Sequence, residues 1–256
     1  MLAELLHGPA VIEFDNITTD IVAHKSLCSM LTSGLITGRI LGSSKVCTVS
    51  TQTLVLSSGN NVQPIDDMTR RCITINLVSA SEMPAQRSFS RPNLTEEVLS
   101  RREEYVSAAL TVVTAWVHAG RPMSPGKPVA SFGKWSDLCR QPILWLGHPD
   151  PASSIFHAIQ KDPGRELLAR LLENWHALIG STPMAVRALL KHLNKLGDPG
   201  AQLQEVLEDI GGDRAGVNAR RLGHWLKRHS NRPVGGKFLV AANQSSQSTQ
   251  WAVRTI

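Results

Sequence analysis

Three groups of polar side chains near the start of the chain have the chemistry needed to hold a phosphorylated ligand. They are one carboxylate, two adjacent amides and two adjacent guanidiniums: Asp15, Asn60, Asn61, Arg70 and Arg71. A carboxylate at a strand end supplies the hard oxygen that Mg²⁺ prefers. A guanidinium aimed at a transferring phosphoryl group stabilises the charge that develops in the transition state. These side chains could therefore form one phosphate-directed site if the fold brings them together.

Short apolar runs place each group next to a predicted strand. Ala10–Phe14, Thr53–Leu56 and Cys72–Leu77 are short and rich in apolar residues. Runs of this length and composition are typical of buried strands. In open α/β sheets, ligands bind outside the carboxyl ends of the strands. We therefore expect the carboxylate and the two amides to meet at one edge of a sheet.

The residues between the first two strands predict a helix and a hairpin. Ile21–Leu31 has apolar residues at helical spacing. The following alternation of β-branched residues around Gly42-Ser43-Ser44 predicts a β-hairpin.

The segments VIEFDN, SSGNN and MTRR, in this order and spacing, resemble the second half of a P-loop ATPase core of the superfamily-3 helicase or AAA+ kind. The resemblance covers roughly Gly8–Val78 and is closest to ATPases and primase-helicases of phages and integrative elements. It implies Mg²⁺ and ATP as cofactors and a hexameric ring for the complete protein. The roles it implies are magnesium binding for Asp15, sensing of the γ-phosphate for Asn60 or Asn61, and a finger toward a neighbouring subunit's nucleotide for Arg70 or Arg71.

The same resemblance extends to the hairpin, and the chain departs from the family at Asn16. It implies that the hairpin projects into a central channel and touches DNA through Arg39 or Lys45. Many relatives have Glu directly after the magnesium-binding Asp, where it orients the attacking water. This chain has Asn16 there, so the water-positioning role is unassigned.

The phosphate-gripping motif of such ATPases is missing from these 256 residues. No G-x-x-x-x-G-K-[ST] occurs, and Gly126-Lys127 is followed by Pro128. That loop supplies the backbone N–H groups and the Lys that hold the β- and γ-phosphates. We therefore expect no ATP hydrolysis by this polypeptide alone, and a partner that carries the motif. The strand before the loop would also be absent, which predicts an open sheet with an unpaired edge and a truncated or split gene product.

Each assignment has a simpler alternative. Asp15-Asn16 could cap the next helix, and Arg39 and Lys45 could be solvated residues of a surface hairpin. The arginine pair could form ordinary surface ion pairs with Asp66 and Asp67, worth about 0–1 kcal/mol.

Composition limits the class of protein further. No apolar run approaches the length of a transmembrane helix, and the N-terminus lacks the pattern of a signal peptide. The four cysteines form no C-x-x-C pair, which argues against a zinc site and for a reduced, cytoplasmic location. The formal charge of +6 is concentrated at the C-terminus, because eight Lys and Arg residues and no acidic residue follow Asp213.

The sequence of the middle of the chain predicts helices. Thr95 is expected to cap a long helix that runs to about Ala119. The residues predicted to form its buried face are Val98, Tyr105, Ala109, Val112, Val113 and Trp116. The scattered tryptophans and histidines of this region lack the spacing of a binding site and are interpreted as core or surface residues.

The C-terminal segment predicts three helices followed by a hairpin. The helices are expected to begin near Thr182-Pro183, Asp198-Pro199 and Asn218, and the strands are expected at Lys237–Ala241 and Gln250–Arg254. This order is similar to a winged helix-turn-helix, whose third helix enters the major groove of DNA. The motif NARRLGHWLKRH also resembles the C-terminal segments of phage-type primase-helicases. The predicted DNA-binding residues are Arg220, Arg221, His224, Lys227, Arg228 and Lys237, with a solvated face or an RNA or protein contact as alternatives.

Together these patterns predict a mostly α-helical chain in three parts. Residues 1–90 form a partial α/β P-loop (AAA+-like) core, 91–180 an all-α domain, and 181–256 a winged helix-turn-helix. The expected function is that of a fragment of a mobile-element or prophage DNA-replication helicase, with DNA and a polypeptide bearing the missing half as partners. The alternative is a non-catalytic DNA-binding or replication accessory protein with a vestigial ATPase half.

Overall fold

A computed structural model of the chain describes residues 2–42, 44–79, 82–83, 86, 88–214, 216–244 and 248–256. It divides into two compact units, residues 1–159 and 160–256. The division falls at the end of α7 (Ser153–Gln160), so that α8 (Pro163–Ile179) packs with the C-terminal residues. The predicted boundary lay at residue 180, which would separate α8 from the residues that pack against it. Among the described residues, no helix combines the length and the apolar character needed to cross a membrane.

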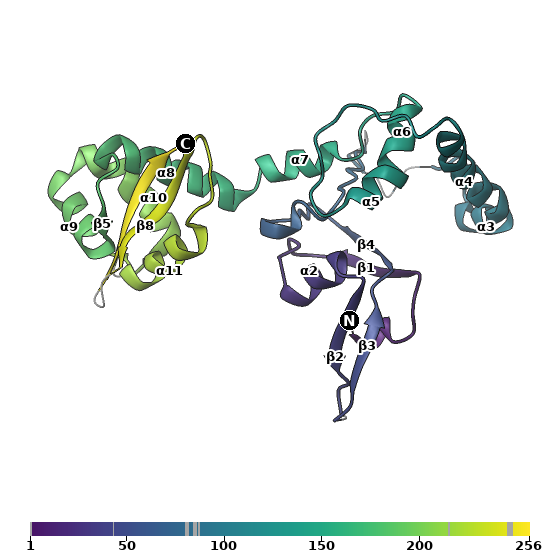
Figure 1. Ribbon diagram of the computed structural model, residues 1–256, viewed down its shortest axis with the longest axis horizontal. Helices are drawn as coiled ribbons and strands as arrows, with labels where there is room; N and C mark the ends of the chain where they lie inside the picture. The colour runs from purple at the N-terminus through teal and green to yellow at the C-terminus, as the bar shows by residue number, and fades with distance from the viewer. Residues whose placement is uncertain are drawn as a thin grey trace. The chain divides into compact units, whose positions relative to one another are not determined.

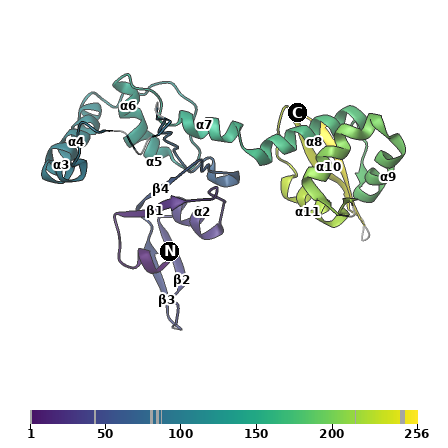
Figure 2. The same ribbon diagram turned by 180° about the vertical axis from the view of Figure 1, so that it is seen from behind.

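The first part of the N-terminal unit has two small sheets and two helices (Figure 1). In chain order these are α1 (Leu2–Leu5), β1 (Val11–Ile17), α2 (Lys25–Thr32), β2 (Leu35–Arg39), β3 (Val46–Ser50) and β4 (Leu54–Gly59). β1 pairs with β4 in parallel, with Val11 opposite Leu54, and β2 and β3 form the predicted antiparallel hairpin. Both views show this hairpin extending away from the β1–β4 pair (Figure 2).

One face of the β1–β4 pair is covered. Ile12 and Val55 lie opposite each other and pack against a small core formed by Leu5, Met30 and Val49. α2 begins four residues later than predicted because the His24 ring accepts a hydrogen bond from the N–H of Ser26 and caps the helix. These contacts fix β1 and β4 as neighbours and so bring together the residues at their carboxyl ends.

The opposite face and the outer edge of this pair are open, and one predicted strand is absent. Leu54 and Leu56 are about half exposed, so β4 is not the buried strand that was predicted. Cys72–Leu77 belongs to no strand, and Ile75 and Leu77 are 79% and 93% exposed. The prediction was wrong because strand formation needs a paired neighbour, and none of the described residues pairs with this segment.

The helical part of the N-terminal unit differs from the predicted single long helix. Its helices are α3 (Leu94–Ser100), α4 (Arg102–His118), α5 (Gly133–Trp135), α6 (Gln141–Trp145) and α7, with a π-helical turn at Ser136–Arg140. The helix breaks at Arg101, whose φ of −111° and ψ of 23° lie outside the helical region. Of the predicted buried face only Trp116 is buried; its Nε1 donates to the Pro122 carbonyl at 2.9 Å. Val98, Tyr105 and Ala109 are exposed because nothing among the described residues packs on that side of α3 and α4.

A buried ion pair stabilises the loop after α4. Arg140 is 2% exposed, and its guanidinium donates to both carboxylate oxygens of Asp150 at 2.8 and 2.6 Å and to the Lys127 carbonyl at 2.8 Å. Gly126 permits this approach, because a Cβ at that position would lie 2.7 Å from Arg140 Nη2. The hydrogen bonds from Arg140 hold the pKa of Asp150 below its ordinary value, despite partial burial.

We predict that Asp150→Asn destabilises residues 121–159 by about 3–5 kcal/mol, since it leaves the buried Arg140 cation unpaired. Arg140→Met should cost less, because Asp150 retains some exposure to water. A carboxylate whose folded pKa is depressed stabilises the fold above its unfolded pKa of about 4, and this stability is lost as the pH falls through the folded value. Hydrogen exchange of this segment against pH measures both effects. A larger cost for Arg140→Met than for Asp150→Asn contradicts the assignment.

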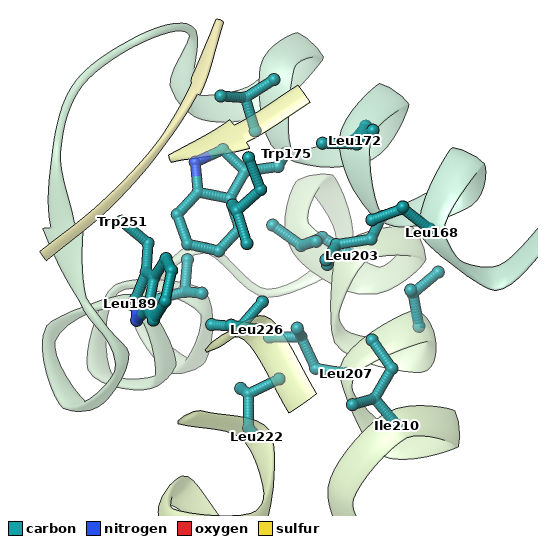
Figure 3. Packing of buried hydrophobic residues seen from close by; sticks show 14 of the residues in the cluster. Leu168, Leu172, Trp175, Leu189, Leu203, Leu207, Ile210, Leu222, Leu226 and Trp251 are labelled. Carbon is teal, nitrogen blue, oxygen red and sulfur yellow. The ribbon is translucent and has the colours of Figure 1, made fainter. Parts of the chain in front are cut away.

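The C-terminal unit is a helical bundle with a small sheet. Its elements are α8, β5 (Met184–Ala185), α9 (Val186–Leu196), a 3-10 turn at Asp198–Gly200, α10 (Ala201–Gly211), β6 (Gly212–Asp213), β7 (Gly216–Val217), α11 (Ala219–His229), β8 (Lys237–Gln244) and β9 (Thr249–Thr255). One three-stranded sheet has the order β5-β9-β8, and both of its strand pairs are antiparallel. The β8–β9 pair is the predicted hairpin. Trp175 lies among leucines contributed by all four helices, and Leu189, Leu203 and Leu226 are fully or almost fully buried (Figure 3).

The two units differ in how well they bury apolar side chains. Among the described residues, 16 buried hydrophobic residues lie in the C-terminal unit and 8 in the larger N-terminal unit. All but one of the exposed large hydrophobic residues, Ile256, belong to the N-terminal unit. The accessible surface of 17656 Å² also exceeds the roughly 13,000 Å² expected for two separate compact units of this combined mass. The C-terminal unit is thus self-contained, whereas the N-terminal unit leaves apolar surface uncovered.

Candidate functional site

α11 is a cationic helix fixed at its start by a side-chain cap. Asn218 Oδ1 accepts hydrogen bonds from the N–H groups of Arg220 and Arg221, each at 3.1 Å, and Asn218 Nδ2 donates to Asp213 at 3.2 Å. The cap was predicted, since Asn is strongly preferred at this position. It places the helix with Leu222 and Leu226 fully buried in the core. Those two contacts determine which side of α11 faces water.

The exposed side of α11 carries the predicted cations. Arg220, Arg221, His224, Lys227 and Arg228 are all exposed, and the helix contains no acidic residue. Arg221 Nη1 donates to the Gly212 carbonyl at 3.1 Å, which fixes its side chain beside the turn before the helix.

Lys237 is half-buried at the start of β8, which packs against α11. The structure therefore brings all the residues predicted from the C-terminal segment onto α11 and the strand beside it. Trp225 and His229 lie on another side of α11, and their rings stack with centroids 3.9 Å apart.

Helix stability explains only the cations at the end of α11, because the helix dipole favours Lys227 and Arg228 in the last turn. A helix N-terminus is the positive end of its dipole, so that Arg220 and Arg221 in the first turn are unfavourable by a few tenths of a kcal/mol. Within the part of the chain that the structure describes, no carboxylate forms an ion pair with Arg220, Arg221 or Lys227. A polyanionic ligand would compensate both effects.

The net charge of the chain is also concentrated in the unit that contains α11. The C-terminal unit holds 14 of the 27 Lys and Arg residues and 8 of the 21 Asp and Glu residues, a formal charge of +6. The N-terminal unit holds 13 of each and is neutral. The whole positive charge of the chain therefore belongs to the unit that contains α11.

A second group of polar residues lies at the carboxyl ends of β1 and β4. The Ser58 hydroxyl donates a short hydrogen bond to Asp15 Oδ1 and accepts one from the Asn16 N–H at 3.1 Å. One loop further on, Asp20 Oδ1 accepts from the Gln63 N–H at 3.0 Å. Ser58 was not predicted, although parallel pairing of Phe14 with Ser57 places it beside Asp15. Asp15 and the end of β4 thus meet at the carboxyl end of the β1–β4 pair, as the two apolar runs predicted.

Asn60 and Asn61 follow β4 directly and are exposed, with Asn61 in the left-handed region at a φ of 55°. Gly59 separates them from Ser58 because the two strands converge there. A Cβ on Gly59 would collide with the Ile17 carbonyl oxygen and lie 2.7 Å from Val62 Cγ2. This glycine therefore sets the position of both amides relative to Asp15.

We predict that Gly59→Ala separates the ends of β1 and β4 and destabilises the pair by about 1–3 kcal/mol, as overpacking of a close contact does. Gly34→Ala is a matched control, because a Cβ there meets nothing within 4 Å. Hydrogen exchange of residues 11–17 and 54–59 should accelerate in the first variant alone. Equal exchange in both variants contradicts the close approach.

The arginine pair is engaged within its own turn. Arg70 Nε donates to Asp67 at 2.5 Å, and Arg71 donates to the same carboxylate at 3.0 and 2.7 Å. Partial burial acts to raise the pKa of Asp67, but the hydrogen bonds from both arginines outweigh it and lower that pKa.

Arg71 is only 7% exposed and also donates to the Cys28 carbonyl in α2 at 3.4 Å. Among the described residues neither arginine hydrogen-bonds Asp15, Asn60 or Asn61. This arrangement matches the ion-pair alternative for Asp67, so that a finger role would require both side chains to leave this carboxylate.

The hairpin cations lie at its turn. Arg39 ends β2, and its Nη2 donates to the Ser44 hydroxyl at 3.5 Å; Lys45 is exposed just before β3. Ser43, at the centre of the predicted turn, lies outside the described residues. The neighbouring Leu41 is fully exposed, so the hairpin end presents both apolar and cationic groups.

The described residues contain no group of three or more His, Cys, Asp or Glu side chains placed to hold a metal ion. Asp15 and Ser58 supply hard oxygens, which suits Mg²⁺ that takes its other ligands from water and phosphate. Comparison with known proteins finds no matching protein family, no similar curated protein and no similar solved structure.

Proposed function

We propose that this chain is a DNA-binding protein whose C-terminal unit is a winged helix-turn-helix module that binds duplex DNA. The observation that carries the proposal is α11, a core-anchored helix whose exposed side carries only cationic, polar and small residues. Lys and Arg side chains on such a helix bind phosphates and release counterions from the duplex. The β8–β9 hairpin directly follows α11, the order expected for a recognition helix and its wing.

Fluorescence anisotropy of the whole chain with a labelled duplex of about two helical turns tests this proposal. We expect micromolar or tighter binding at low salt and a steep linear fall of log K with log salt concentration, by about 0.9 per phosphate contacted. Absence of binding at low salt, or binding that salt does not weaken, would overturn it.

As a second function, we propose that the N-terminal unit is one half of a helicase-type ATPase of a mobile element. Parallel pairing of β1 with β4, with Asp15 beside Ser58 at their carboxyl ends, favours this assignment. Among the described residues no strand pairs with the second edge of β4 or with Cys72–Leu77, so a further strand could pair there. In the related ATPases the strand before the phosphate-gripping loop occupies that position. The alternative, a vestigial ATPase half on an accessory protein, predicts no completion.

In a completed site, each group of this chain would have a simple role. Asp15 would hold Mg²⁺, with the Ser58 hydroxyl keeping the carboxylate oriented through its hydrogen bond. The ion would neutralise charge on the β- and γ-phosphates of ATP. Asn60 and Asn61, at the same strand ends, would donate hydrogen bonds to the γ-phosphate, and Arg70 or Arg71 would serve a neighbouring subunit of a ring.

We predict that the chain alone binds ATP weakly or undetectably, and that adding a polypeptide with G-x-x-x-x-G-K-[ST] on a strand–helix unit restores Mg²⁺-dependent ATP hydrolysis. Arg71→Ala should abolish the restored activity, since one such arginine is worth about 10³-fold or more. Asp67→Asn is the matched control, because it removes the same ion pair but leaves the guanidinium. Equal loss in both variants shows a structural role for Arg71, and no restored hydrolysis favours the vestigial alternative.

A further inference from the structure

α9 carries a row of cations for which the described residues provide no carboxylate partner. Arg187, Lys191 and Lys195 are spaced four residues apart and therefore lie on one side of the helix. All three are exposed, whereas Leu189 and Leu193 are buried in the core on the opposite side. No acidic residue occurs anywhere in α9.

Helix stability does not account for this row. Like charges at i and i+4 destabilise a helix by about 0.2–0.5 kcal/mol per pair, and solvated helices commonly alternate the sign of charge to avoid this cost. The helix dipole disfavours Arg187 in the first turn and favours Lys195 in the last turn, so it does not offset the repulsion along the row. In the part of the chain that the structure describes, none of the three cations forms an ion pair.

The rest of the unit shows that its acidic residues are placed elsewhere. α10 has exposed Glu205, Glu208 and Asp209 and no basic residue. Arg170 of α8 donates to Asp209 at 3.0 Å and to Glu205 at 3.4 Å, so the cation that faces these acids comes from α8. Charge is thus segregated by helix, with α9 and α11 basic and α10 acidic.

α9 and α11 are neighbours in the same core. They contact each other, and Leu189 and Leu193 of α9 share one buried cluster with Leu222 and Leu226 of α11 (Figure 3). Each helix places its cations on the side away from that cluster. A polyanion bound along α11 would therefore lie next to a helix whose exposed side is also cationic.

We propose that Arg187, Lys191 and Lys195 of α9 form a second phosphate-binding ridge, which contacts the backbone of the duplex DNA that α11 binds. This inference rests on the proposed DNA-binding function and adds a site to it. The ridge contacts phosphates only, so it should act equally on all duplex sequences and contribute affinity without specificity.

The test compares three whole-chain variants with the wild type, each with three cations replaced by Gln. The first is Arg187→Gln/Lys191→Gln/Lys195→Gln on α9 and the second is Arg220→Gln/Lys227→Gln/Arg228→Gln on α11. The third, Lys25→Gln/Arg102→Gln/Lys134→Gln, removes the same charge from exposed positions of the N-terminal unit. Binding to a labelled duplex is measured over a salt series, and binding to a single-stranded RNA of equal length in parallel.

The α9 variant should bind duplex about tenfold more weakly, with a salt slope smaller by roughly 2–3, while the N-terminal control is unchanged. Its thermal stability should equal or exceed that of the wild type, since like-charge repulsion within α9 is relieved. Unchanged affinity and slope in the α9 variant, with a loss in the α11 variant, overturns the ridge but leaves the proposed function intact. No binding by the wild type overturns both, and a loss confined to RNA overturns the assignment to duplex DNA.

Discussion

Replacing Arg220, Lys227 and Arg228 of α11 by Gln is expected to weaken binding of the whole chain to duplex DNA by roughly 10- to 100-fold at about 0.15 M salt. These side chains extend from a helix that is capped by Asn218 and anchored by Leu222 and Leu226, so the backbone that presents them is already ordered before a ligand binds. Anisotropy titration measures the loss, and the salt slope should fall by about 0.9 for each phosphate contact removed.

Circular dichroism of this variant is the necessary control, because none of the three residues contributes to the buried cluster. The helix content and the melting temperature should match the wild type. The Lys25, Arg102 and Lys134 variant separates a specific loss from a general effect of net charge. If that control loses as much affinity as the α11 variant, α11 is not the binding surface.

Replacing Trp175 by Ala should destabilise the C-terminal unit by about 3–5 kcal/mol, because truncation of a buried Trp leaves a large cavity. Trp175 is fully buried among leucines from all four helices, and few of them can move to fill the cavity (Figure 3). Hydrogen exchange of residues 160–256 reports the free energy of opening for this unit alone, while exchange in the N-terminal unit should not change.

Trp175→Phe provides the contrasting variant. The indole Nε1 is buried, and none of the described residues accepts a hydrogen bond from it, so that Phe removes an unsatisfied donor together with part of the ring. An unpaired buried donor costs about 1–3 kcal/mol, which should offset much of the lost packing. The Phe variant should therefore lose less than half as much stability as the Ala variant. Equal losses would show that the N–H has a partner in solution.

Local signals were enough to predict α11 and the β8–β9 hairpin, although not that α8 belongs to the same unit. The Asn218 cap, the leucine spacing of α11 and the two strands of the hairpin depend on residues close in sequence, and the structure contains all of them. The row of cations on α9 was equally visible as three like charges four residues apart. These cations precede Asp213, so they lie outside the segment whose lack of acidic residues makes its positive charge conspicuous.

The N-terminal unit was harder to predict because its structure depends on long-range partners. The hairpin and the β1–β4 strands form as expected, but Cys72–Leu77 stays unpaired where a partner strand was assumed. The long helix breaks at Arg101, and its apolar residues remain exposed for the same reason. Ser58 joins Asp15 only through the register of two strands, which brings together residues 43 positions apart and which no local pattern encodes.

Hydrogen exchange of the whole chain with and without a random-sequence duplex tests the central claim most directly. The claim predicts slower exchange on adding DNA in the turn before α11, in α11 itself and at the start of β8, residues 212–240, with residues 1–159 unchanged. Slowing confined to residues 1–159, or no change anywhere at a duplex concentration that saturates binding, contradicts it.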